Sequence, residues 1–200
     1  MILDASQLTQ QEMYKILIGS VIPRPIAWAG TRSKNGVNNL APFSFYNCFS
    51  SNPPILGLST QPRADGRKKD TLQNIEDTHC FTLSCASHRF MQQMSKTAAL
   101  LEPGDDEFVY AGITAAEAQH VAAPYVADAL LVFECTLHDI VRLGSGPGSG
   151  NLILGQVRYV RIKDELYSQG RIDVETLDPV GRLAGDWYST IRDRFEMKRG

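Results

Sequence analysis

The chain has 200 residues, of which 43% are hydrophobic and 21% charged, and its formal net charge at pH 7 is -2. This balance is typical of a globular protein and lacks the broad positive charge that nucleic-acid binding needs. No apolar run is long enough to span a bilayer, and residues 1–17 lack the layout of a signal peptide. We therefore expect a cytoplasmic protein with a single domain, residues 1–200, that binds neither nucleic acid nor membranes.

The first residues predict a helix followed by a strand. Apolar residues recur at helical spacing over residues 8–17, with Thr9 placed as a cap, and we expect this helix to pack on the core. Pro23 and Pro25 indicate an edge or entry before a strand at residues 26–31, because proline cannot donate a ladder hydrogen bond. Arg24, between the two prolines, is interpreted as a solvated residue on that strand edge.

The stretch 38–60 is the most informative part of the chain. Asn35-Gly36, just before it, predicts a tight hairpin that leads into it. The stretch contains no charged residue, mixes Ser and Asn with Phe and Tyr, and breaks at Pro53-Pro54 before a buried strand at residues 55–59. Apolar walls with a few hydrogen-bonding groups suit a flat, partly polar ligand, so we interpret the stretch as the wall of a binding site.

A cationic loop, residues 63–70, follows this wall. It precedes a short helix that begins near residue 71, and Asp70 or Thr71 is predicted as the N-cap. Unpaired N–H groups at a helix N-terminus and neighbouring cations together can hold a phosphate. The alternative is a solvated charged loop, which a run of charges alone favours.

The second half of the chain predicts mainly strands. An acidic cluster at residues 102–108 lacks the ligand spacing of a calcium loop and is interpreted as solvated. A closing helix is expected within residues 179–199, where aromatic side chains either dock on the core or cover a ligand. The remaining expected elements are strands at residues 79–86, 129–140 and 151–162, a helix at 87–101, and a glycine-rich turn at 144–150 that joins the last two strands. This order predicts a closed antiparallel β-barrel with peripheral helices.

Motifs of catalysis by amino-acid side chains are missing from the sequence. It has no Gly-x-Ser-x-Gly elbow, Walker loop, HExxH or Rossmann pattern, and its four histidines are dispersed. The four cysteines form no CxxC pair and are interpreted as reduced and mostly buried, with Cys48 a structural residue. A cofactor that carries the chemistry itself is therefore favoured, and no catalytic side chain is predicted.

Three blocks in a fixed order carry a resemblance to a known family: SVIPRPIAWAGT, NNLAPFSFYNCFSSNPPILGLS and RKKDTLQNI. Together with LILGQV and VGRLAGDWY nearer the C-terminus, they resemble the flavin reductase-like family of FMN-binding split-barrel proteins. The resemblance implies a mostly β fold, a six-stranded antiparallel Greek-key split barrel. It further implies a homodimer with FMN near the subunit interface, and redox chemistry with NADH or NADPH.

The resemblance also implies roles for individual residues. Those along the isoalloxazine ring and ribityl chain would be Asn39, Ala41, Pro42, Phe43 and Ser44, and those of a neighbouring wall Trp28, Ala29 and Thr31. The phosphate side would include Ser59, Arg67, Lys69, Asp70 and Thr71, and the nicotinamide side Arg182, Trp187 and Tyr188. Arg67 and Lys69 can make charge-assisted bonds to phosphate, with the Thr71 hydroxyl completing the shell, whereas Asp70 caps the helix or orients Lys69. Because extra cations precede this block, the choice between Arg67, Lys68 and Lys69 stays open.

The leading hypothesis is an FMN-dependent oxidoreductase that transfers hydride from NADH or NADPH to flavin N5. Electrons would then pass to free flavin, a ferric complex or a partner oxygenase. One alternative is a non-enzymatic FMN-binding electron carrier without a nicotinamide site. Another is a flavin-free split-barrel protein that uses the same pocket for a different ligand.

Overall fold

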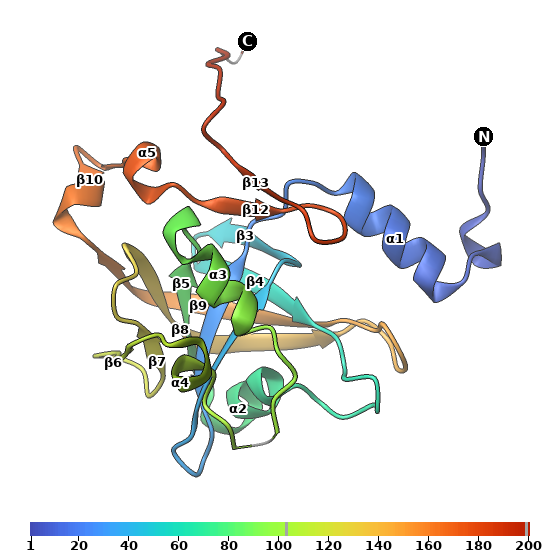
Figure 1. Ribbon diagram of the computed structural model, residues 1–200, viewed down its shortest axis with the longest axis horizontal. Helices are drawn as coiled ribbons and strands as arrows, with labels where there is room; N and C mark the ends of the chain where they lie inside the picture. The colour runs from blue at the N-terminus through green and yellow to red at the C-terminus, as the bar shows by residue number, and fades with distance from the viewer. Residues whose placement is uncertain (103, 199) are drawn as a thin grey trace.

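A single seven-stranded sheet organises the molecule. The structure, a computed structural model, describes residues 1–102, 104–198 and 200. The strand order is β2-β1-β5-β8-β9-β4-β3, and all neighbours are antiparallel (Figure 1). The strands are β1 Ala27–Arg32, β2 Asn38–Phe43, β3 Tyr46–Ser51, β4 Pro54–Thr60, β5 Cys80–Cys85, β8 Leu131–Arg142 and β9 Asn151–Ile162. The predicted mostly-β class is confirmed, with seven strands in this sheet in place of six.

Two predicted hairpins organise this sheet. The β1–β2 turn has Gly36 at φ +84°, a conformation that glycine adopts without steric cost. The glycine-rich segment at residues 144–150 joins β8 to β9, the two longest strands, as expected. Strands β2 and β3 form the two edges of the sheet although only Ser44 and Phe45 separate them in the chain. This short link therefore runs between the two edges of the sheet.

The core lies on both faces of the sheet because successive strand residues point to opposite sides. On β1, Ala27 and Ala29 belong to one buried cluster with Leu58 and Phe81, whereas Trp28 belongs to another with Leu40. Trp28 is fully buried, and its Nε1 donates to Thr97 Oγ1 at 2.9 Å. Burial of such aromatic and aliphatic side chains supplies the main driving force for folding.

Short elements surround the sheet. The helices are α1 Gln10–Ser20, α2 Asp70–Thr78, α3 Met91–Lys96, α4 Glu107–Ala111 and α5 Val174–Leu177. Three further antiparallel pairs are β6 Ala115–Glu117 with β7 Pro124–Val126, β10 Tyr167–Ser168 with β11 Arg171–Ile172, and β12 Val180–Arg182 with β13 Tyr188–Thr190. No helix in the described parts of the chain is both long and apolar enough to cross a bilayer.

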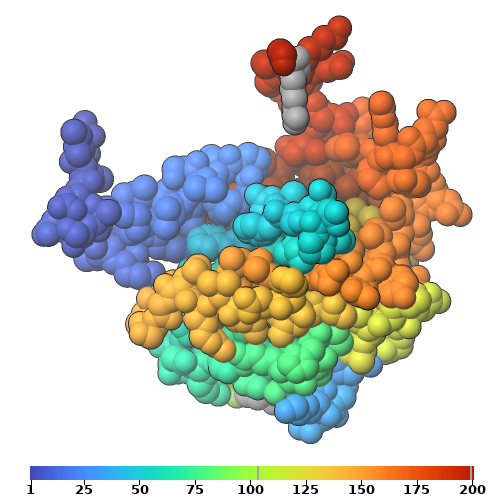
Figure 2. All heavy atoms as spheres, turned by 180° about the vertical axis from the view of Figure 1, so that it is seen from behind, coloured from blue at the N-terminus to red at the C-terminus, as the bar shows by residue number. Residues whose placement is uncertain are grey.

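Helix α1 forms as predicted but does not pack as predicted. Thr9 accepts a bond from the Glu12 N–H, and the Glu12 carboxylate accepts one from the Thr9 N–H, which completes a capping box. No residue of α1 is buried, and the helix projects to one side of the molecule in Figures 1 and 2. Its exposed apolar side chains include Ile16 and Leu17. The helix is therefore an arm with an uncovered apolar surface within one chain.

Several other expectations were wrong. The described residues of 179–198 contain the β12–β13 hairpin and an extended tail where a closing helix was expected. The helix expected over residues 87–101 is limited to α3 and a preceding 3-10 turn, His88–Phe90. Cys48 is exposed on the edge strand β3, not buried. In the acidic cluster at residues 102–108, Glu102 and Asp105 are exposed as expected, whereas Glu107 lies in α4 and is buried; Pro103 lies outside the described residues.

Candidate functional site

The cations that precede α2 differ in whether a carboxylate pairs with them. Arg67 is exposed, and its Nε lies 2.6 Å from the carboxylate of Asp65 in the same loop. Lys68 is also exposed and forms an ion pair with Glu76 of α2. Both cations are therefore neutralised at the surface. Neither lines the cavities described below.

Lys69 differs from its two neighbours. It is half-buried, and no carboxylate among the described residues lies within 4.0 Å of its Nζ, which sits 5.5 Å from the centroid of the Phe43 ring. Burial, and then the charge of Arg63, lower the pKa of the Lys69 ammonium. Its ammonium group therefore lacks a compensating negative charge, which an anionic ligand would supply.

The N-terminus of α2 is open to a ligand. Lys69 is the N-cap residue, and no side chain among the described residues caps the first-turn N–H groups. The prediction of Asp70 or Thr71 as N-cap was therefore wrong. Asp70 is the first helical residue and pairs with Arg63, so it does not orient Lys69. Free N–H groups and the helix dipole at this end both favour an anion.

A cavity of about 360 Å³ lies beside this helix end. We call it the Ser59 cavity; it is lined by Tyr14, Pro42, Phe43, Ser44, Phe45, Ser59, Gln61, Pro62, Arg63, Ala64, Lys69 and Leu100. Lys69 gives it a positive end, beside the Arg63 guanidinium that is paired with Asp70, and aromatic rings and prolines give it apolar walls. This combination suits a flat molecule that carries an anionic group.

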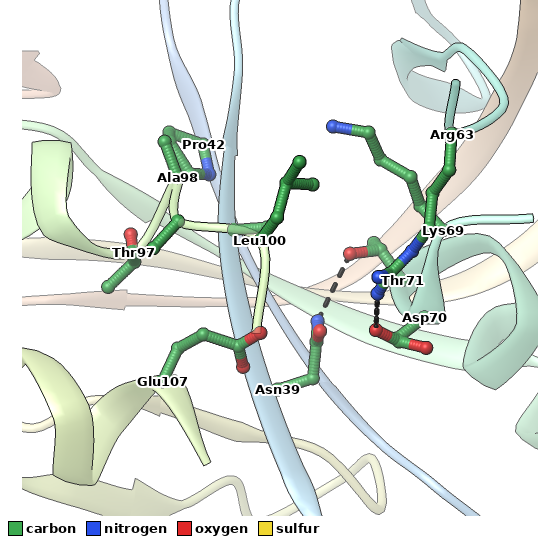
Figure 3. A pocket seen from close by; sticks show the side chains of 12 residues that line it. Asn39, Pro42, Arg63, Lys69, Asp70, Thr71, Thr97, Ala98, Leu100 and Glu107 are labelled. Carbon is green, nitrogen blue, oxygen red and sulfur yellow. Dashed lines mark hydrogen bonds and ion pairs between the residues drawn. The ribbon is translucent and has the colours of Figure 1, made fainter. Parts of the chain in front are cut away.

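A smaller cavity of about 60 Å³ adjoins it and shares Pro42, Arg63, Lys69 and Leu100 (Figure 3). We call it the Glu107 cavity; its other lining residues are Asn39, Ala41, Asp70, Thr71, Thr97, Ala98, Ala99 and Glu107. Residue Glu107 is 7% exposed, and its carboxylate accepts a 3.0 Å bond from the Leu40 N–H. Burial raises the pKa of Glu107 to about 7, although this hydrogen bond opposes the shift.

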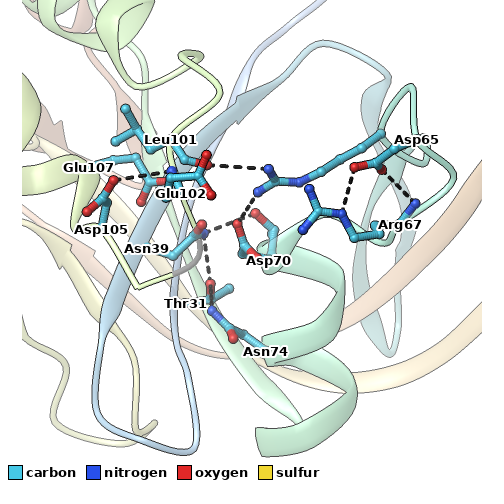
Figure 4. A network of polar contacts seen from close by, with 12 residues as sticks. Thr31, Asn39, Asp65, Arg67, Asp70, Asn74, Leu101, Glu102, Asp105 and Glu107 are labelled. Atoms are coloured by element: carbon cyan, nitrogen blue, oxygen red, sulfur yellow. Dashed lines mark hydrogen bonds and ion pairs between the residues drawn. The ribbon is translucent and has the colours of Figure 1, made fainter.

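A buried amide and hydroxyl network fixes the wall between these cavities and the core (Figure 4). The Asn39 Nδ2 donates to Thr31 Oγ1 and Thr71 Oγ1, each at 3.0 Å, and the Asn74 Nδ2 donates to Thr31 Oγ1 at 3.1 Å. These bonds join β1, β2 and α2. Because satisfied buried polar networks are rigid, the network holds the helix end in place against the strands.

Comparison with known proteins identifies the family. The family model described as "Flavin reductase like domain" matches residues 18–175. The chain belongs to the flavin reductase-like family. An uncharacterized protein of Halalkalibacterium halodurans, BH2278, is 35% identical over 199 residues, which cover 98% of this chain and 95% of that protein.

Solved structures agree with this membership of the flavin reductase-like family. Nitrilotriacetate monooxygenase component B from Bacillus cereus superposes with a TM-score of 0.94 at 34% identity, covering 98% of each chain. A split-barrel protein from Shewanella frigidimarina assigned to the flavin reductases gives a TM-score of 0.84 at 20% identity, covering 100% of each chain, and this likeness concerns the fold. The fold of this family member is thus the split barrel that the resemblance implied.

The structure brings together most residues that the family resemblance singled out. Those that line one or both cavities are Asn39, Ala41, Pro42, Phe43, Ser44, Ser59, Lys69, Asp70 and Thr71. Trp28, Ala29 and Thr31 are fully buried and line neither cavity, so they support the wall from behind. Arg67 lines neither cavity. The Thr71 hydroxyl accepts a bond from Asn39 within the network, and its phosphate role stays a prediction, because a hydroxyl that accepts one bond can still donate another.

Residues predicted for the nicotinamide side lie apart from these cavities. Arg182 and Tyr188 pair across the β12–β13 hairpin, with the guanidinium 4.5 Å from the ring centroid. Trp187, in the connecting turn, is 75% exposed. None of the three lines the Ser59 or Glu107 cavity. Within one chain they form a separate group.

Sequence reasoning missed several residues that line the two cavities, among them Arg63, Leu100 and Glu107. Arg63 reaches the site by pairing with Asp70, seven residues later, which no local pattern indicates. Leu100 follows α3 in a segment that was expected to be helical. Glu107 could have been found, because Asp106 caps α4 and therefore places Glu107 in the first turn, beside the buried Phe108.

Proposed function

We propose that this protein is an FMN-dependent oxidoreductase that takes hydride from NADH or NADPH. The electrons then pass to free flavin, a ferric complex or a partner oxygenase. One observation carries the proposal: Lys69, without a carboxylate partner among the described residues, stands at the open N-terminus of α2 and on the wall of the Ser59 cavity. The chemistry of these donors suits the phosphate of FMN.

The residues present fit the two ends of this cofactor. Lys69, Arg63 and the first-turn N–H groups of α2 would hold the phosphate, and Asp70 would keep Arg63 in position. Pro42, Phe43 and the Ser44 backbone would lie against the ring system, whose flat faces match apolar walls. When bound, FMN supplies hydride acceptance and electron transfer. The chain supplies binding, orientation and N–H groups near Ser44 that favour negative charge on the reduced ring.

We also propose that the active form is a homodimer. Helix α1 carries Tyr14, Ile16, Leu17 and, just beyond its end, Val21 and Ile22 as exposed apolar side chains. Exposed apolar side chains gathered on one short segment are typical of an interface. Tyr14 also lines the Ser59 cavity, so a partner seated on α1 would lie close to the proposed flavin.

A partner oxygenase is one of three proposed acceptors. The similar Bacillus cereus structure is named as component B of a monooxygenase, which supports this choice.

The candidates for the nicotinamide side remain Arg182, Trp187 and Tyr188. Because they lie outside the cavities of their own chain, they would most simply approach the flavin of the other subunit.

Anaerobic titration tests the proposal. Purified protein is expected to be yellow or to bind FMN, and the flavin absorbance should bleach on addition of NADH or NADPH. Acceptors from the three classes are then added in turn to the reduced protein. Bleaching by dithionite without bleaching by either nicotinamide would favour the electron carrier. Protein that cannot bind FMN would refute the flavoprotein assignment.

A further inference from the structure

Arg24 is buried, which contradicts its interpretation as a solvated edge residue. The residue is 6% exposed. Its Nη1 donates to the carbonyl oxygens of Ile18 and Val21 at 2.8 and 2.7 Å, and its Nη2 donates to that of Leu183 at 2.9 Å. The prolines on either side fix the backbone of Arg24, and its side chain turns inward between the end of α1 and the β12–β13 hairpin. The sequence pattern described the backbone correctly but not the side chain.

The acceptors of Arg24 leave its charge incompletely compensated. All three close acceptors are neutral carbonyls, and no carboxylate among the described residues lies within 4.0 Å of the guanidinium. A guanidinium has five N–H groups. Here Nε has only a 3.5 Å contact with Ser44 Oγ, and the second hydrogen of Nη2 has no acceptor among the described residues. The carbonyls at the end of α1 contribute only the partial negative charge of a helix C-terminus.

A second arginine adds to the positive charge. Arg24 and Arg182 form an isolated antiparallel bridge, with N···O distances of 3.0 and 2.8 Å. In the described residues, the Arg182 guanidinium has an aromatic ring and a carbonyl as neighbours but no carboxylate within 4.0 Å. Two cations without nearby acids make this part of the molecule attractive to an anion.

A cavity of about 270 Å³ opens beside Arg24. We call it the Arg24 cavity; it is lined by Leu17, Val21, Pro23, Arg24, Pro25, Ser44, Phe45, Tyr46 and Asn47. None of these residues is acidic, and most are apolar or aromatic. Ser44 and Phe45 line the Ser59 cavity as well, so the two cavities share a wall.

We propose that the Arg24 cavity binds a small organic carboxylate built on a single ring. The carboxylate would meet the remaining N–H groups of Arg24, and the ring would pack against Phe45 and Leu17. A dry cavity of about 150 Å³ already accepts benzene, so about 270 Å³ suits one substituted ring and is too small for a dinucleotide. The proposed carboxylate site follows from these contacts alone. Only its position beside a flavin rests on the proposed function.

Benzoate and benzamide are matched probes for this site, because they share shape and differ in charge. Isothermal titration of the full chain is expected to show benzoate binding at least about tenfold tighter than benzamide. FMN is titrated separately into the same protein. If the protein bound benzoate but not FMN, the flavin assignment would be refuted and the Arg24 site would stand. Equal affinities for the two probes, or no benzoate binding, would overturn the Arg24 site.

Two tryptophan variants locate the binding. Leu17→Trp should fill the cavity and abolish benzoate binding, and because Leu17 is 44% exposed the fold should tolerate the change. Ile16→Trp, on the same helix but outside the cavity lining, is the control and should keep wild-type benzoate affinity. Lys69→Met should also keep it. If Lys69→Met abolished benzoate binding and Leu17→Trp did not, the carboxylate would sit in the Ser59 cavity and the inference would be wrong.

Discussion

The Nζ of Lys69 lies 5.5 Å from the centroid of the Phe43 ring, which places over an aromatic wall an ammonium group that has no carboxylate within 4.0 Å in the described parts of the chain. A cation over an aromatic face gains about 0.5–2 kcal/mol, less than an ion pair in a well-formed binding site provides. Lys69 is thus positioned by Phe43 but still lacks a negative partner. An anionic ligand at the end of α2 would supply it.

Replacing Lys69 with Met should weaken FMN binding about 10- to 100-fold, because a hydrogen bond to a charged group contributes about 1.5–3 kcal/mol. The apolar stem is retained, so the stability of the fold should change little. Fluorescence titration of FMN into the apo-protein measures the effect.

Lys68→Met is the matched control for Lys69→Met. Lys68 is paired with Glu76 at the surface and lines neither cavity, so its loss should leave FMN affinity within about threefold of wild type, corresponding to the small energies of surface pairs. A Lys68 variant that loses more affinity than the Lys69 variant would show that the ion pairs were assigned the wrong way round.

Much of this site was predictable because its determinants are local. The charge-free stretch, the Asn35-Gly36 turn and the cations before α2 each indicate a backbone feature that the structure contains. The choice among the cations was not predictable, because Asp65, Glu76 and Asp70 neutralise three of them through pairs that depend on how loop and helix pack. Burial of Arg24 likewise depends on carbonyls at residues 18, 21 and 183 that only the fold assembles.

Glu107 should make the stability of the protein depend on pH. Its folded-state pKa is about 7 against an ordinary value of 4.5, so between these values the folded protein binds more protons than the unfolded chain. The free energy of unfolding should therefore fall as the pH rises through this window and stay lower above it. At about 1.4 kcal/mol per pKa unit, this one group accounts for about 3 kcal/mol.

Glu107→Gln tests this dependence, because it keeps an oxygen acceptor for the Leu40 N–H and removes the titration. Urea unfolding at about pH 5 and pH 8 should show a smaller loss of stability in the variant than in the wild type. Glu196→Gln, in the exposed tail, controls for the change in net charge and should behave like the wild type. An unchanged pH dependence in Glu107→Gln would contradict the prediction.

Gly30 in β1 should not tolerate a side chain. A Cβ there would collide with the Pro124 carbonyl oxygen and lie 2.6 Å from Thr82 Oγ1. Gly30→Ala should therefore destabilise the protein by about 1–3 kcal/mol or more, the typical effect of overpacking. Gly19→Ala is the control: it lies in α1 with open space around it and should stabilise the helix by up to about 1 kcal/mol. Thermal unfolding of both variants distinguishes the two effects, and equal stabilities would contradict the packing described for β1.

Ile16 should contribute to the proposed homodimer through the apolar surface of α1. The side chain is 42% exposed in one chain, and burying an isoleucine gains up to about 1.5–3 kcal/mol. Ile16→Glu places a charge on that surface and should raise the dimer dissociation constant at least about tenfold, measured by analytical ultracentrifugation over a concentration series. Gln11→Glu adds the same charge to the exposed polar part of the helix and should leave the dimer intact. If Ile16→Glu remained as dimeric as Gln11→Glu, α1 would lie outside the dimer interface. Its exposed apolar side chains would then belong to the binding surface for another partner.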